Sequence, residues 1–222
     1  MLRPRKKIHR KEIKEDALVT NYFRVRKLAD RFSRQINIGL IALLAIAVVL
    51  ILMARSKRGA EIKAQEKLGL AEQAYYMNDY ARVVNDMEPI LKNYPGTRAA
   101  GTAAFYTANA YFAQANVAEA EKHYKMVVDH YGQNPLFSAS SLAGLAAIED
   151  SRKQSMKAAQ LYEKAGKKYP NLYAAPFYLK EAARCYLSAG KKTEARELLD
   201  RIQKKYPDSA VSEEVKWLRE SS

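Results

Sequence analysis

Few side chains in this sequence have types that could do chemistry, and their spacing supports little of it. His123 and His130 are seven residues apart and would share one face of a helix. A metal site needs a third and a fourth donor, and local spacing brings no Cys or acidic residue to them. We therefore interpret both histidines as solvent-facing. The one cysteine, Cys185, has no histidine near it in the sequence and is interpreted as a small core side chain.

Motifs for phosphate binding and nucleophilic catalysis are absent. None of the nine glycines falls in G-x-G-x-x-G or G-x-x-x-x-G-K, and G-x-S-x-G does not occur. The acidic pairs Glu119/Glu121 and Glu213/Glu214 lie beside Lys and Arg on amphipathic stretches, where solvated surface roles are far commoner than acid–base catalysis. The sequence therefore predicts no enzyme, no cofactor, no metal site and no small-molecule substrate.

The formal charge of +14 is unevenly distributed along the chain. Residues 1–35 hold 12 of the 38 Lys and Arg against four acidic residues, a net charge of +8, and the other 187 residues carry +6. In that remainder acids and bases are interspersed, which is typical of a solvated helical surface and not of a phosphate-binding stripe. We expect no nucleic-acid binding.

Residues 36–54 form an uncharged apolar run, INIGLIALLAIAVVLILMA. At about 1.5 Å per helical residue this run spans roughly 28 Å, close to the ~30 Å hydrocarbon core of a bilayer. A core helix would keep one polar stripe, and a cleaved signal peptide would have a shorter n-region and a shorter apolar run. The run therefore predicts an uncleaved helix through the lipid bilayer.

The basic segment before this run has an amphipathic pattern of its own. Its apolar residues recur every three or four positions, at Leu18, Tyr22, Val25, Ala29 and Phe32. A basic helix of this kind binds anionic lipid headgroups or, as the alternative, a partner helix. Basic residues are balanced on the two sides of the run, and the excess in the whole segment favours a cytoplasmic N-terminus with the longer C-terminal part outside.

Four copies of one pattern follow, and they end at Tyr94-Pro95, Tyr131-Gly132, Tyr169-Pro170 and Tyr206-Pro207. Spacings of 37, 38 and 37 residues indicate a solenoid of helical hairpins. We expect an all-α protein with a basic tail (1–35), a transmembrane helix (36–54), a linker or helix extension (55–63) and a repeat domain (64–222). The repeats are expected at 64–95, 101–132, 139–170 and 176–207, with a capping helix at 209–219.

Small residues stand at matching places in the copies, namely Ala108, Ala120, Ala146, Ala158, Ala183 and Ala195. They allow two helices to approach closely, while aromatic residues fill the space to the next copy. The order of small residue, aromatics, turn, small residue, aromatic and closing proline resembles the tetratricopeptide repeat, over about 150 residues. The resemblance implies a protein-binding solenoid whose copies are stable only through their neighbours.

In that family the first helices of successive copies line a concave groove, so the resemblance nominates groove residues. These are Glu72, Tyr75, Tyr76, Phe105, Asn109, Phe112, Phe177, Lys180 and Arg184. An aromatic end and a basic end would suit a partner segment with apolar side chains and some acids. Alternatively, Tyr75, Phe105 and Phe112 pack between hairpins. A clamp for a C-terminal carboxylate is disfavoured, because Leu68, Glu72 and Tyr106 occupy its positions.

Two further features resemble bacterial envelope proteins. Copies longer than about 34 residues, with endings such as YPDSAVSEEVKWL at 206–218, are similar to envelope tetratricopeptide proteins. The stretch KEIKEDALVTNYF at 11–23, one span and then repeats resemble the ancillary subunit family of the Sec translocon. This implies an inner-membrane protein whose periplasmic repeats bind translocon subunits or exported clients. The alternative is a fixed scaffold subunit or assembly factor of another membrane complex.

Overall fold

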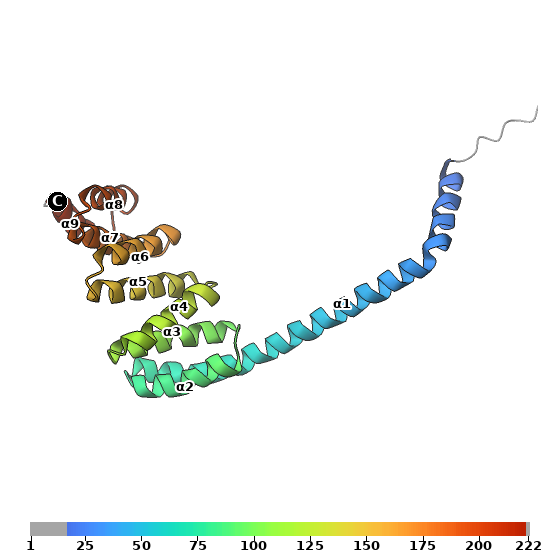
Figure 1. Ribbon diagram of the computed structural model, residues 1–222, viewed down its shortest axis with the longest axis horizontal. Coiled ribbons are helices and arrows are strands. Elements are labelled where there is room, and N and C mark those ends of the chain that lie inside the picture. The colour runs from blue at the N-terminus through green and yellow to red at the C-terminus, as the bar shows by residue number, and fades with distance from the viewer. Residues whose placement is uncertain (1–16, 221–222) are drawn as a thin grey trace, which may run out of the picture. The chain divides into compact units, whose positions relative to one another are not determined.

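The computed structural model describes residues 17–220, and every regular element in that range is a helix. Residues 1–16, the first part of the expected basic tail, lie outside the described residues. In chain order the helices are α1 (Ala17–Tyr76), α2 (Tyr80–Asn93), α3 (Arg98–Ala113), α4 (Val117–His130), α5 (Pro135–Ser151), α6 (Ser155–Lys168), α7 (Ala175–Ser188), α8 (Lys192–Lys205) and α9 (Ser212–Glu220) (Figure 1).

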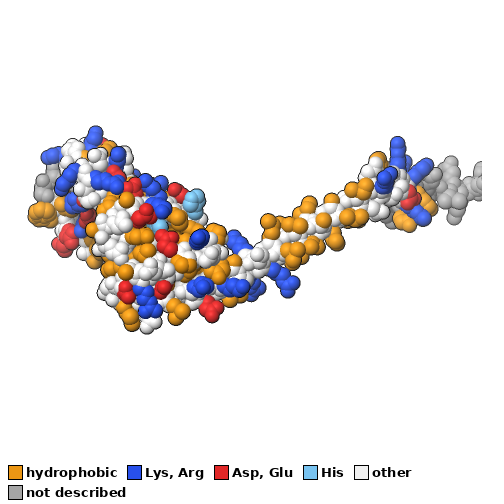
Figure 2. Space-filling view, turned by 60° about the horizontal axis from the view of Figure 1, so that its bottom comes forward, with side chains coloured by type: hydrophobic (Ala, Val, Ile, Leu, Met, Phe, Trp, Pro, Cys, Tyr) orange, Lys and Arg blue, Asp and Glu red, His pale blue; other side chains and the backbone are white. Residues whose placement is uncertain are grey.

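Two compact units divide the chain, Met1–Ser56 and Lys57–Ser222, and α1 has residues in both. Within the segment Asp30–Tyr76, an 18-residue window has a mean hydropathy of 3.0 and none of it is buried. Figure 2 shows hydrophobic side chains along this apolar run without charged ones among them. By length and composition, α1 can cross a membrane.

Part of the expected amphipathic stripe is visible at the start of α1. Tyr22, Val25 and Phe32 are exposed, and the side chains of Leu18 and Ala29 lie outside the part of the chain that the structure describes. The exposed rings and the charged residues between them belong to the same helix as the apolar run.

In the second unit, the end of α1 and the helices α2 to α9 form successive hairpins (Figure 1). Each helix from α2 onward packs mainly on its neighbours in sequence. One core cluster joins α1, α2 and α3 through residues such as Leu68, Met87 and Ala103, and another joins α6, α7, α8 and α9. The prediction of an all-α stack of hairpins is confirmed.

Small residues bring the helices of this stack close together. The six alanines that stand at matching places in the last three copies have no exposed surface. Two glycines come closer still: a Cβ on Gly144 would lie 2.6 Å from the ring of Tyr124, and one on Gly166 would lie 2.6 Å from Cγ of Leu179. The alanine spacing therefore marks the helix interfaces, as predicted.

Each hairpin turn contains one residue with a left-handed backbone. These residues are Asn78 (φ 59°), Ala115 (φ 58°), Lys153 (φ 62°) and Gly190 (φ 73°), with the same spacings of 37, 38 and 37 as the repeat ends. A Cβ in this conformation costs roughly 1–2 kcal/mol. The turn is thus retained in all four copies even where its residue is not glycine.

The tyrosines that close the copies also connect them. The hydroxyl of Tyr206 donates to the carbonyl oxygen of Pro170 at 2.7 Å, and the hydroxyl of Tyr131 accepts from the backbone N–H of Gly96 at 3.5 Å. After the last copy, Val215 of α9 and Val211, which directly precedes α9, are buried against the end of the stack. This helix lies where the sequence predicts a capping helix, at 209–219.

Candidate protein-binding surface

The first helices of the four hairpins, α1, α3, α5 and α7, contact one another through their side chains, and α9 continues the row. The contacts join Tyr75 with Tyr106, Phe105 with Phe137, Ser140 with Tyr178, and Lys180 with Glu214. We call the surface that carries these contacts the first-helix surface. It contains most of the residues that the sequence nominated for partner binding.

One half of this surface is aromatic. The ring centroids of Tyr75 and Tyr106 are 4.6 Å apart, and Phe105 stacks on Phe137 with centroids 4.6 Å apart and planes at 16°. The hydroxyls of Tyr76 and Tyr106 are 3.4 Å apart, and Tyr76 is 73% exposed. We call these five residues the aromatic patch. Its rings contact each other across three helices and still present area to solvent.

Asn109 fixes the position of one ring of the patch. Its Nδ2 donates to the Tyr75 hydroxyl at 3.2 Å, and its Oδ1 accepts from the Tyr124 hydroxyl at 2.7 Å. Burial raises the pKa of Tyr124, so this hydroxyl stays protonated and remains a donor. Asn109 therefore positions Tyr75. Phe112 lies one turn further on, is 41% exposed and meets the Tyr124 ring edge-on.

Glu72 is a half-buried carboxylate at the edge of the aromatic patch. It lies one helical turn before Tyr75 and Tyr76 on α1. Burial raises the pKa of Glu72. Burial also raises the pKa of Tyr106, followed by the hydrogen bond with Tyr76, and the nearby charge of Glu72 adds to that effect. The carboxylate thus interacts electrostatically with the patch.

The other half of the surface holds the nominated basic residues, and acidic side chains neutralise them. Lys180 Nζ is 2.5 Å from Glu214 of α9 and 3.3 Å from Glu181. Arg184 pairs with Asp150 of α5 at 2.7 Å and with Glu181 at 2.8 Å. The expected basic end is therefore neutralised by carboxylates from α5, α7 and α9.

Helix α9 borders this same half of the surface. A hollow of about 300 Å³ is lined by Lys180, Glu181, Arg184, Glu214, Trp217 and Leu218. Trp217 is 68% exposed. Phe177, the remaining nominated residue, is partly buried against the last core cluster and its ring centroid is 6.0 Å from that of Tyr173. It packs beside the core and lies outside the aromatic patch.

Tyr106, Phe137 and Glu61 were not nominated from the sequence. Tyr106 follows Phe105 directly, and its aromatic type was the one available signal. Glu61 accepts from the backbone N–H groups of Arg98 at 2.7 Å and Ala99 at 3.0 Å, at the start of α3. No local sequence pattern predicts these two hydrogen bonds, whose partners are 37 and 38 residues apart in the chain. Glu61 belongs to the segment expected as a linker or helix extension, and that segment is helical.

The interpretation of His123 as solvent-facing is wrong. Its side chain is 1% exposed, and Nε2 lies 3.0 Å from Glu88 Oε1. The side chain faces α2, which the spacing to His130 could not reveal. His130 is exposed, and Cys185 is buried in the last core cluster. Within residues 17–220, no group of three His, Cys, Asp or Glu side chains is placed to hold a metal ion.

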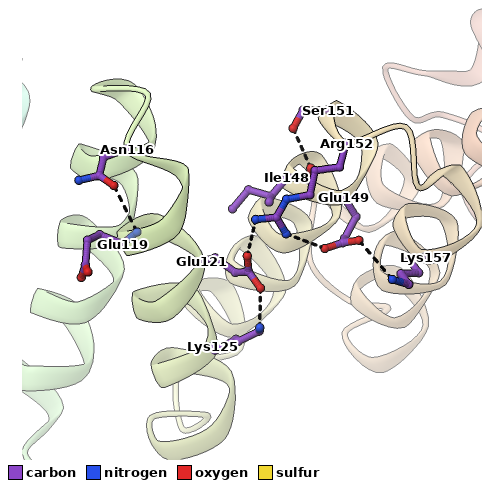
Figure 3. A network of polar contacts seen from close by, with 9 residues as sticks. All are labelled: Asn116, Glu119, Glu121, Lys125, Ile148, Glu149, Ser151, Arg152 and Lys157. Atoms are coloured by element: carbon purple, nitrogen blue, oxygen red, sulfur yellow. Dashed lines mark hydrogen bonds and ion pairs between the residues drawn. The ribbon is translucent and has the colours of Figure 1, made fainter.

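The acidic pair Glu119 and Glu121 splits into two separate roles. Arg152 donates to Glu121 of α4 at 2.7 Å and to Glu149 of α5 at 3.0 Å, and Lys125 also bonds Glu121 (Figure 3). Hydrogen bonds from Lys125 and Arg152 lower the pKa of Glu121. Glu119 pairs separately with the nearby Lys122. Glu121 therefore joins two hairpins, whereas Glu119 forms an ion pair within α4.

A family model described as tetratricopeptide repeat matches residues 68–135, and a second one with the same description matches residues 154–213. The chain is a tetratricopeptide repeat protein. Repeats of this family typically form non-catalytic scaffolds for protein–protein interaction, which implies protein partners in general.

Solved structures share the fold. Two of them are of a Podosopora anserina chain described as a kinesin light chain with nearly identical TPR-like repeats, one of them a variant. The variant is 21% identical, with a TM-score of 0.51, and the match covers 65% of this chain and 76% of that chain. The other structure has the same identity and coverage and a TM-score of 0.50. At this identity the similarity shows the fold alone. Comparison with curated protein sequences finds no match.

Proposed function

We propose that this tetratricopeptide repeat protein is a membrane-anchored scaffold that binds segments of other proteins on its first-helix surface. The observation that carries the proposal is the aromatic patch, whose rings are held by neighbours and remain partly open to solvent. Aromatic side chains dominate interface energetics because they bury a large area with little loss of rotamer freedom. Residues 36–54 would place the scaffold in a bilayer.

We further propose a bacterial inner-membrane location, with the N-terminus in the cytoplasm and the repeats in the periplasm. The net charge of +8 in residues 1–35 supports this orientation. The resemblance of the anchor-and-repeat arrangement to ancillary Sec translocon subunits supports an accessory role at the translocon or in envelope protein biogenesis. Partners would then be translocon subunits or exported clients.

Binding and location have separate tests. A photo-crosslinking amino acid in place of Tyr76 should capture a discrete partner, whereas the same amino acid in place of Leu70 should not. Leu70 is a matched control because it is 67% exposed on the same helix. Equal capture at both positions would overturn the role of the first-helix surface. Identification of a translocon subunit or exported client supports the accessory role, and a constant-stoichiometry complex of other membrane proteins would replace it with a fixed-subunit role.

Location is tested by protease treatment of cells that carry a C-terminal tag. Loss of the tag after permeabilisation of the outer membrane alone supports periplasmic repeats. Protection until lysis overturns the periplasmic and translocon proposals and leaves a cytosolic scaffold. Extraction of the protein by carbonate without detergent would overturn the membrane anchor.

A further inference from the structure

Glu72 differs from the other half-buried carboxylates of the first-helix surface. Glu181 and Asp150 both bond to Arg184, whereas the described residues offer Glu72 no ion pair and no hydrogen bond from a side chain. The charge of Glu72 acts on the Tyr106 hydroxyl, whose pKa is raised mainly by burial and further by this carboxylate. A carboxylate that loses water without gaining a partner destabilises the fold, so packing of the domain does not explain this residue.

The surroundings of Glu72 are those of a site for a cation. The faces of aromatic rings carry partial negative charge and attract ammonium and guanidinium groups. Tyr75, Tyr76 and Tyr106 supply such rings beside the carboxylate, and the hydroxyls of Tyr76 and Tyr106 supply acceptor oxygens. A cation placed there would gain an ion pair, ring contacts and hydrogen bonds together.

We propose that Glu72 and the aromatic patch bind one Lys or Arg side chain of a partner segment whose neighbouring side chains are apolar. The cation meets Glu72, and the apolar neighbours lie on Phe105 and Phe137. This inference rests on the proposed protein-binding function and specifies its partner. It also reverses the expectation of an acidic partner segment, because Lys180 and Arg184, which would have attracted acids, are already neutralised.

The experiment is selection from a library of random ten-residue peptides on the full chain in detergent. Enriched peptides should carry a Lys or Arg at one fixed position among apolar residues. Binding of one enriched peptide is then measured on the wild type and on Glu72→Gln, and compared with a peptide that has norleucine at that position. Glu66→Gln is the matched control, since Glu66 is an exposed carboxylate on the same helix.

Removing either charge should weaken binding about tenfold, and removing both should weaken it no further. Glu66→Gln should bind both peptides as the wild type does. Circular dichroism of Glu72→Gln should match the wild type, because this carboxylate has no partner to lose among the described residues. The tenfold loss would then belong to binding and not to folding.

Other outcomes separate this inference from the function on which it rests. Enriched peptides without basic residues would overturn the cation site but leave a protein-binding surface. The same holds if replacing the basic residue by norleucine weakens binding to Glu72→Gln as much as it weakens binding to the wild type. Absence of any enriched peptide, or enrichment that survives Tyr106→Arg in the centre of the patch, overturns both. Enrichment of acidic peptides would also overturn the cation site, and it would indicate that the partner binds the half of the surface that holds Lys180 and Arg184.

Discussion

Acidification should destabilise the repeat domain through His123, which is buried between α4 and α2. The Nε2 atom lies 3.0 Å from Glu88 Oε1, so the neutral ring carries its proton on Nε2 and donates it. The Nδ1 atom is buried and has no partner among the described residues. Burial, assisted by the charge of Lys122, lowers the pKa of His123 to about 4. The charge of Glu119 opposes this shift, and the Glu88 carboxylate that accepts from the ring is 43% exposed, so water screens its attraction.

The sign and size of the effect follow from linkage. The unfolded chain binds the His123 proton near its ordinary pKa of 6.5, and the folded chain binds it only near 4. Stability is therefore fully present above pH 6.5 and is lost as the pH falls towards 4. One pKa unit corresponds to about 1.4 kcal/mol, so the complete loss is about 3 kcal/mol. Between about pH 7.5 and about pH 5.5 the loss is about 1.3 kcal/mol.

The assay is urea unfolding of the full chain in detergent, followed by circular dichroism at those two pH values. The wild-type midpoint should fall by about 0.5 M on acidification. His123→Leu removes the titrating group and should lose most of that fall, whereas His130→Gln, at an exposed position of the same helix, should keep it. An equal fall in the wild type and His123→Leu would refute the reasoning, since the buried ring would then take up its proton as readily in the folded chain as in the unfolded one.

Three further substitutions test the packing of the stack by the same assay. Gly166→Ala puts a Cβ within 2.6 Å of a buried leucine and 3.1 Å of a backbone oxygen, so it should cost about 1–3 kcal/mol, whereas Gly69→Ala, where nothing lies within 4 Å, should not destabilise. Ala115→Gly should stabilise by about 1 kcal/mol because its φ is 58°; a loss of stability would contradict the strained turn. Glu61→Ala should cost about 1–2 kcal/mol because the backbone N–H groups of Arg98 and Ala99, at the start of α3, lose their charged acceptor. An equal cost in Glu66→Ala would show that these bonds contribute nothing.

The hairpin stack was predictable because close helix packing restricts the residue type at fixed places. Ala120 and Ala158 are each fully buried where the repeat period places them, and a larger side chain there would separate the helices. The same period places Asn78 and Gly190 in left-handed turns. Features that every copy must have leave a periodic signal, and a single sequence reveals them.

The bonds that distinguish one copy from another leave no such signal. The period puts Lys180 and Arg184 on the surface of first helices, but their charges are neutralised by Asp150 and Glu214, 34 residues before Arg184 and 34 after Lys180. Which carboxylate meets which base depends on the rotation of each hairpin relative to the next. The hydrogen bonds of Glu61 could not be predicted from the sequence either, because they depend on the residue at which α3 begins.

The two halves of the first-helix surface differ in what a partner must break or cover when it binds. A partner that met Arg184 would have to replace hydrogen bonds of 2.7 and 2.8 Å to carboxylates, and breaking a partly buried ion pair leaves a charge behind. A partner that met Tyr76 or Glu72 would break no ion pair among the described residues and would cover ring area that water now contacts. We therefore expect the binding energy to be concentrated on α1 and α3. Because α1 also contains the apolar run, one continuous helix bears both the membrane-crossing candidate and the carboxylate that we expect to select the partner.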